Sequence, residues 1–166
     1  MQDTLSRYLA AVAGGSTRNA LRPVLTELCD NTSSVVLSSA GLVITATSGK
    51  YVPKIGAADC YAIASGVLVK IAAGTDMPAL SGVITAGKYN VFAFFVDSAG
   101  TVTSAMGTEG AAIGNVVFPP IPQGKAMLGF IIVTYASTFT GGSVALDTAT
   151  TVYISPLTSF DPTVLI

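Results

Sequence analysis

The spacing of apolar residues divides the chain into two parts. In residues 3–30 they recur at the three- and four-residue intervals of an amphipathic helix. Two such faces follow one another: Leu5, Tyr8, Leu9 and Val12, then Leu21, Val24, Leu25 and Leu28. Helices this short are not stable alone in water, so we expect both to dock on the rest of the chain or on a partner. Residues 1–32 are therefore predicted to form an N-terminal helical arm.

From residue 33 onward the pattern is that of short β-strands with turn residues every 8–12 positions. The expected strands are 35–37, 42–45, 61–64, 67–71, 83–84, 88–96, 101–103, 116–118, 127–135 and 151–154. Residues 38–41 predict a hairpin turn between the first two strands, and residues 97–100 predict a tight turn after the long strand 88–96. We expect residues 33–166 to form one β-sandwich or jelly-roll-like domain, and the pattern leaves open a jelly roll or an immunoglobulin-like topology.

The two strongest predicted strands, 88–96 and 127–135, are apolar on both faces, whereas a strand buried on one side should alternate. Two explanations remain open for each strand. Either a helix or loop of the same chain covers the second face, or another subunit does. The low charge of the whole chain favours the second explanation. The residues then predicted to contact another subunit are Tyr89, Phe92, Phe94, Phe95, Phe130 and Ile132.

The composition of the chain is unusual because so few of its residues are charged. Only 10% of the 166 residues are charged and 51% are hydrophobic, against about 25% charged in an ordinary soluble domain. No apolar run approaches the roughly 20 residues of a membrane-spanning helix, and the N-terminus does not have the pattern of a secretory signal. We therefore expect no membrane partner. Burial against other protein subunits explains the composition, and it predicts an assembly component.

The distribution of charged residues does not favour binding to nucleic acid. The formal net charge is −1, and the eight basic residues are scattered along the chain. Neutralising phosphates requires a basic patch or stripe, so direct nucleic-acid binding is not expected.

The chemistry of the usual catalytic sites is missing from the sequence. There is no histidine, which removes Ser-His-Asp and Cys-His catalysis and most zinc sites. No pair stands out among the acids that a glycosidase would need: Asp59, Asp76, Asp97, Glu109 and Asp147. Residues 110–114 lack the strand–Gly–Lys–helix context of a phosphate loop. We predict no enzyme, no cofactor and no metal site.

Two cysteines, Cys29 and Cys60, are too few for a disulfide framework. A single bridge between them is possible, but we expect free, buried thiols because cysteine packs as a small hydrophobe.

Three segments carry a resemblance to a known class of protein. Residues 86–103 contain a Gly-Lys-Tyr strand with an Asp-x-x-Gly turn, residues 117–133 contain Pro-x-Gly-Lys-x-x-x-Gly, and residues 139–147 follow. In this order they resemble β-rich virion proteins of tailed bacteriophages, especially small head decoration, cement or fibre-base proteins. The resemblance covers roughly residues 83–155, under half of the chain.

The resemblance implies a non-enzymatic virion protein, assembled in the bacterial host cytoplasm, that forms a homo-oligomer, expected to be a trimer. Its partner would be the major capsid protein or a neighbouring virion protein. The N-terminal arm would anchor it to the capsid through Leu5, Tyr8, Leu9, Leu21 and Leu25. The alternatives are a tail, portal-vertex or fibre-base protein, or a carbohydrate-binding β-sandwich module. An exposed cluster of Tyr with Asp or Asn on a concave face would favour the module.

Overall fold

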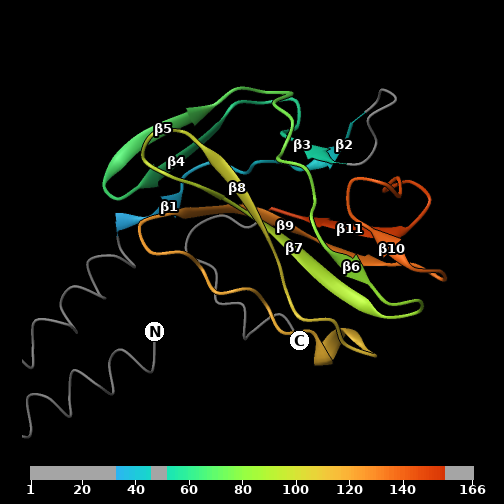
Figure 1. Ribbon diagram of the computed structural model, residues 1–166. Helices are drawn as coiled ribbons and strands as arrows, with labels where there is room; N and C mark the ends of the chain where they lie inside the picture. The colour runs from blue at the N-terminus through green and yellow to red at the C-terminus, as the bar shows by residue number, and fades with distance from the viewer. Residues whose placement is uncertain (1–32, 46–51, 156–166) are drawn as a thin grey trace, which may run out of the picture.

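Antiparallel strands make up nearly all the regular structure of the computed structural model, which describes residues 33–45 and 52–155 (Figure 1). The predicted mainly β fold is confirmed. Residues 1–32, 46–51 and 156–166 lie outside the described part of the chain, and the predicted helical arm lies among them. In chain order the elements are β1 (Val35–Val36), β2 (Val43–Ile44), β3 (Pro53–Lys54), β4 (Cys60–Ala64), β5 (Val67–Ile71), β6 (Val83–Ile84), β7 (Tyr89–Val96), β8 (Val102–Met106), the 3-10 turn η1 (Ile113–Asn115), β9 (Ala126–Thr134), β10 (Phe139–Thr140) and β11 (Thr150–Ile154).

The largest sheet has four strands in the order β11-β9-β7-β8, all antiparallel. Strand β7 lies inside it, paired with β9 from Tyr89 to Val96 and with β8 from Phe92 to Val96. The β7–β9 register shifts between Phe94 and Phe95, which is a β-bulge. The long apolar run that predicted a strand at 88–96 therefore forms the interior of the sheet.

The turn after β7 is held by Asp97, as its sequence predicts. The Asp97 Oδ1 atom accepts hydrogen bonds from the backbone N–H of Ala99 (3.0 Å) and of Thr101 (2.9 Å). Gly100 has a φ of 82°, a conformation that glycine adopts at no steric cost. This turn joins β7 to β8 as a hairpin.

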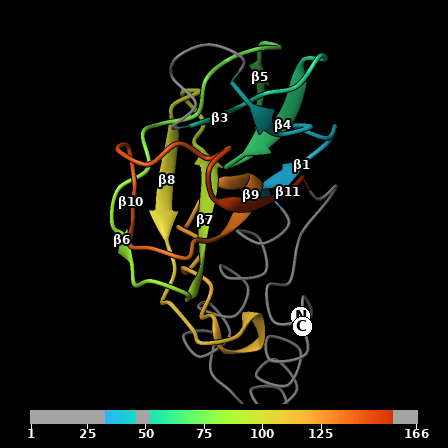
Figure 2. The same cartoon turned by 90° about the vertical axis from the view of Figure 1, so that its right-hand side faces the viewer.

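A second sheet, in the order β1-β4-β5, packs against one face of the main sheet (Figures 1 and 2). Strands β4 and β5 form a hairpin whose two turn residues, Ser65 and Gly66, have φ values of 49° and 77°. Positive φ at both positions is the geometry of a type I′ turn, which matches the twist of the two strands. Residues of both sheets share the main hydrophobic core, among them Val36, Ala62, Val69, Phe92, Phe94 and Leu128.

The predicted hairpin at residues 38–41 is wrong. Strand β1 pairs with β4, while β2 pairs with β3 and β6 pairs with β10. The backbone N–H groups of Leu37 and Ser38 both donate to the carbonyl of Tyr61, so the chain continues along β4 instead of turning back. Beyond it, Ala40 and Leu42 are buried in the core. Burial of these apolar residues outweighs the local turn signal.

Other differences from the expected strands are small. Residues 116–118 form only an isolated bridge, between Thr108 and Val117. The two-residue strands β3 and β10 were not predicted. Each is too short to show a periodic pattern in the sequence.

The second face of the main sheet is covered by the same chain. Residues 107–125, here called the covering segment, connect β8 to β9. Val116 and Phe118 of this segment pack on a second core, which includes Val91, Phe95 and Phe130. The rings of Phe118 and Phe130 meet edge to face, with centroids 5.2 Å apart and planes at 88°. The two-sided apolar character of β7 and β9 is thus satisfied within one chain.

Gly129 in β9 lies where three chain segments approach one another closely. A Cβ atom placed on Gly129 would lie 2.6 Å from the carbonyl oxygen of Ile154 and 2.7 Å from Cδ1 of Leu42. Glycine is required here by space, because the backbone of β11 and the side chain of Leu42 occupy the volume of a side chain.

We expect Gly129→Ala to lower the free energy of unfolding by about 1–3 kcal/mol, since an added methyl group in a packed core forces neighbours to shift. Urea unfolding followed by tyrosine fluorescence would show a lower midpoint at an unchanged m-value. An unchanged midpoint would mean that β9 and β11 can separate at this point without cost.

Candidate functional site

The six residues predicted to contact another subunit divide between buried and half-buried positions. Phe92, Phe94, Phe95 and Phe130 have at most 1% of their surface exposed. Phe92 and Phe94 belong to the main core, and Phe95 and Phe130 to the second core under the covering segment. A ring buried in its own chain offers no surface to another subunit, so these four phenylalanines are core residues.

Tyr89 and Ile132 are half-buried, and a subunit contact remains a prediction for these two alone. Of the two explanations for the apolar second face, the loop of the same chain is the one that the structure contains. The predicted capsid-anchoring residues lie outside the described part of the chain: Leu5, Tyr8, Leu9, Leu21 and Leu25.

The most unusual exposed surface is the side of the β1-β4-β5 sheet that faces away from the main core. Register places Ile63 between Val35 and Leu68, and Tyr61 beside Lys70. We call this surface the outer face, and it consists of Val35, Leu37, Tyr61, Ile63, Leu68 and Lys70. Burial alternates along these strands, because Cys60, Ala62, Ala64, Val69 and Ile71 point into the core.

A sheet with one solvated face normally carries polar residues on that face. Here the exposed fractions of Leu37, Tyr61 and Leu68 are 52%, 38% and 63%. Lys70 is the one charged member, and its Nζ atom lies 2.7 Å from Oδ2 of Asp59. A contiguous exposed apolar patch of this kind is typical of an interaction surface.

The outer face was not predicted from the amino-acid sequence. The available signal was that the alternate positions 61, 63, 68 and 70 carry one charged residue, Lys70, and otherwise Tyr, Ile and Leu. A strand buried on both faces has the same pattern. The outer face can therefore be recognised only when the pairing partner of each strand is known.

The covering segment carries a second group of exposed apolar side chains. Ile113, Val117 and Ile121 are 44%, 61% and 43% exposed. These residues point away from the core that Val116 and Phe118 cover. They are separated in sequence by turn and proline residues and share no strand, so they form no continuous face of a sheet.

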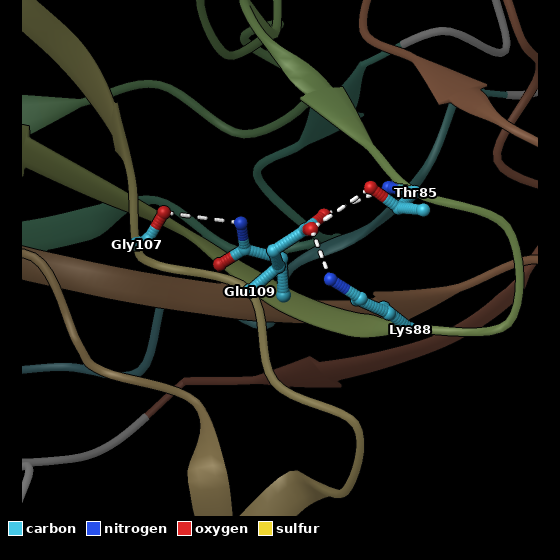
Figure 3. A network of polar contacts seen from close by, with 5 residues as sticks. Thr85, Lys88, Gly107 and Glu109 are labelled. Carbon is cyan, nitrogen blue, oxygen red and sulfur yellow. Dashed lines mark hydrogen bonds and ion pairs between the residues drawn. The ribbon is translucent and has the colours of Figure 1, made fainter.

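A polar network ties the start of the covering segment to the turn before β7 (Figure 3). The Oε1 atom of Glu109 lies 2.7 Å from Nζ of Lys88 and accepts a hydrogen bond from Oγ1 of Thr85 (2.8 Å). The backbone N–H of Thr85 donates to the other carboxylate oxygen (2.7 Å). Both carboxylate oxygens of Glu109 therefore bind groups of the same chain.

The buried amide of Asn90 continues this attachment. Its Nδ2 atom donates to the carbonyl of Gly107 (3.0 Å), and its Oδ1 atom accepts from the N–H of Val91 (2.8 Å). Tyr89 and Gly110 exchange two backbone hydrogen bonds of 2.9 Å. The covering segment is therefore fixed at its start by both side chains and backbone.

The partners of Glu109 and Asp59 lower the pKa of both carboxyl groups. Lys88, followed by the two donors of Thr85, lowers the pKa of Glu109 to about 2. The hydrogen bond from Lys70, with that from the N–H of Ala73, also lowers the pKa of Asp59. Both carboxylates are ionised near neutral pH, and neither can act there as a general acid.

Cys60 is fully buried and is free of any disulfide, as expected for a small apolar packing residue. Its thiol donates to the carbonyl of Ser38 (3.2 Å), and burial raises its pKa. A buried thiol with a raised pKa is a poor nucleophile. Cys29 lies outside the described residues.

A shallow, open depression of about 730 Å³ lies beside the β2–β3 ladder. Its described lining consists of small residues and one charged side chain, that of Lys54, with Ser39, Ala40, Gly41, Val43, Gly56, Ala57, Ala58, Ala73 and Gly74. It brings together none of the candidate acids. Residues 33–45 and 52–155 also contain no cluster of three or more His, Cys, Asp or Glu able to hold a metal ion.

Comparison with known proteins finds no matching family model, curated protein or solved structure. Within the part of the chain that the structure describes, no helix has the length and apolarity needed to cross a membrane. Among the surfaces of the described residues, the outer face has a composition typical of an interaction site.

The Glu109 network predicts a defined dependence of stability on pH. A carboxyl group whose pKa falls on folding stabilises the folded state fully above its ordinary pKa near 4.5, and this contribution is lost as pH falls toward about 2. We expect Glu109→Gln to lower the melting temperature at pH 7 and to flatten its decline between pH 5 and pH 2.

Thermal melts at half-unit pH steps provide the measurement. Near pH 2 the two proteins should nearly converge, because the wild-type carboxyl is then about half protonated in the folded state and almost fully protonated in the unfolded state. Parallel curves over the whole range would show that the ion pair with Lys88 does not form in solution.

Proposed function

We propose that this chain is a non-enzymatic virion structural protein of a tailed phage, of the head decoration or cement type. It binds and reinforces the capsid shell as a symmetric oligomer, expected to be a trimer. The observation that carries the proposal is the apolar outer face of the β1-β4-β5 sheet in a chain with only 10% charged residues. The proposal includes a β-sandwich or jelly-roll-like arrangement of the sheets.

Solvent exposure of apolar side chains supports this proposal. Ten large apolar side chains are at least 38% exposed in the described part of the chain: Leu37, Val43, Tyr61, Val67, Leu68, Val83, Ile113, Val117, Ile121 and Val152. Burying such side chains contributes roughly 25 cal/mol per Å² of apolar surface. A protein that binds a capsid shell can bury these side chains against the shell.

An oligomer that makes several identical weak contacts with the shell binds it stably. A standard protein interface buries about 1,600 Å² in total, and several identical contacts made by one oligomer raise the overall avidity. Little charge is needed for such binding, which suits the composition. The N-terminal residues Leu5, Tyr8, Leu9, Leu21 and Leu25 are proposed as the anchor to the shell.

The resemblance also includes fibre-base proteins, so a position at the tail or portal vertex is the main alternative. Both positions need apolar surfaces and symmetric contacts. A carbohydrate-binding module gains no support from an exposed tyrosine cluster, since Tyr61 is the one tyrosine among the strongly exposed apolar residues described.

Mass spectrometry of purified particles of the phage that carries the gene tests the proposal. We expect the chain in the particles at a copy number that is a multiple of three and in fixed ratio to the major capsid protein. Immunogold labelling over the whole head favours the decoration role, whereas labelling at a single vertex favours the alternative. Absence from particles, with the chain abundant in the infected lysate, would refute the proposal.

Deletion of residues 1–30 separates anchoring from folding. We expect the truncated chain to keep the far-ultraviolet circular dichroism of a β-protein and to lose binding to particles stripped of the native protein. Co-sedimentation with the particles measures the binding, and the full chain is the control. Normal decoration by the truncated chain would show that the β-domain carries the anchor.

A further inference from the structure

The three-stranded sheet ends in an edge strand with no partner among the described strands. Among the described strands, β5 pairs only with β4, in the register Ala64–Val67, Ala62–Val69 and Cys60–Ile71. In a two-residue hairpin the residues flanking the turn form a hydrogen-bonded pair, and hydrogen-bonded and non-hydrogen-bonded pairs then alternate. Val67, Val69 and Ile71 thus direct their backbone groups at β4. The N–H and C=O groups of Leu68 and Lys70 point to the free edge.

This edge borders the apolar outer face. Leu68 belongs to both, and it is 63% exposed. Natural proteins protect edge strands with charges, prolines, bulges or covering loops. Strand β5 has a single lysine, no proline and no bulge. An exposed apolar edge of this kind is suited to adding another strand.

We propose that β5 pairs antiparallel with β5 of a second copy of this chain, across a two-fold axis at Val69. The two three-stranded sheets then form one six-stranded sheet with a continuous outer face. The occupant is a second copy because the edge is complementary to itself, which a two-fold interface requires. This contact between copies does not depend on a virion role.

The register follows from the residues of β5. Residues directly opposite each other on two paired strands lie on the same face of the sheet. The outer faces of the two copies therefore join into one only if the two-fold axis passes through a residue and not between two residues. An axis at Lys70 would set two lysines opposite each other, which is destabilising. An axis at Leu68 would require ladder hydrogen bonds from Gly66, whose φ of 77° belongs to the turn.

An axis at Val69 pairs all five residues of β5 and satisfies the outward groups of Leu68 and Lys70 in both copies. Each Lys70 then lies opposite Leu68 of the other copy, and its aliphatic stem can cover that side chain. The ammonium group keeps its partner Asp59, 2.7 Å away in the same chain. The contact adds no uncompensated charge, and the shared outer face doubles in apolar area.

Native mass of the full chain, measured by light scattering and sedimentation velocity over a range of concentrations, tests the pairing. We expect a concentration-dependent doubling, from one chain of 16.8 kDa to two, or from a trimer to twice a trimer. Leu68→Lys places like charges opposite each other and should weaken the doubling step at least tenfold. Val117→Lys is the matched control, because Val117 is equally exposed (61%) but lies on the covering segment.

The two proposals fail in distinguishable ways. A trimer that does not double, or doubling that Leu68→Lys leaves unchanged, overturns the β5 contact and leaves the virion role intact. Absence of the chain from particles overturns the virion role and leaves the β5 contact intact. Circular dichroism of both lysine variants confirms that the fold is retained.

Cysteine pairs test the register independently. In a Cys29→Ser/Cys60→Ser background, Leu68→Cys with Lys70→Cys should give disulfide-linked dimers under mild oxidation, because facing Cα atoms of a hydrogen-bonded pair lie about 5.5 Å apart. Leu68→Cys alone faces no thiol and should remain monomeric on a non-reducing gel. Efficient cross-linking by the single variant, or none by the pair, overturns the proposed register.

Discussion

The pairing of β7 with β9 is the interaction on which the rest of the structure depends. It runs from Tyr89 to Val96, and nearly every side chain along it is buried on one face or the other. Neither strand can be solvated on either side, so the chain must supply two layers. The three-stranded sheet forms one of these layers, and the covering segment forms the other.

The order of the strands explains the covering segment. Strand β8 lies on one side of β7 and β9 on the other, so the connection between them has to cross the sheet. Passing over the second face allows the connection to bury Phe118 against Phe130. Asn90 and Glu109 satisfy polar groups where the crossing begins. The contacts of Glu109 with Lys88 and Thr85 thus hold the backbone where the crossing begins.

The sequence could predict features that depend on neighbouring residues. The long strands β7 and β9 follow from continuous apolar runs, and the turn at Asp97 follows from its own side chain. Features that depend on distant pairing could not be predicted. The turn expected at residues 38–41 does not form, because Val36 pairs with Ala62 of β4. The apolar second face of β7 was assigned to another subunit, because no sequence signal located Phe118 above it.

The close approach at Gly129 brings together the beginning and the end of the described chain. The N–H of Leu42 donates to Oγ of Ser155 (2.9 Å), and Ile154 and Leu42 both crowd Gly129. We expect tension between the two ends of the described chain to load this short bridge and the outer strands β1 and β11 first. The central β7–β9 ladder should carry a pulling force only after those outer contacts have opened.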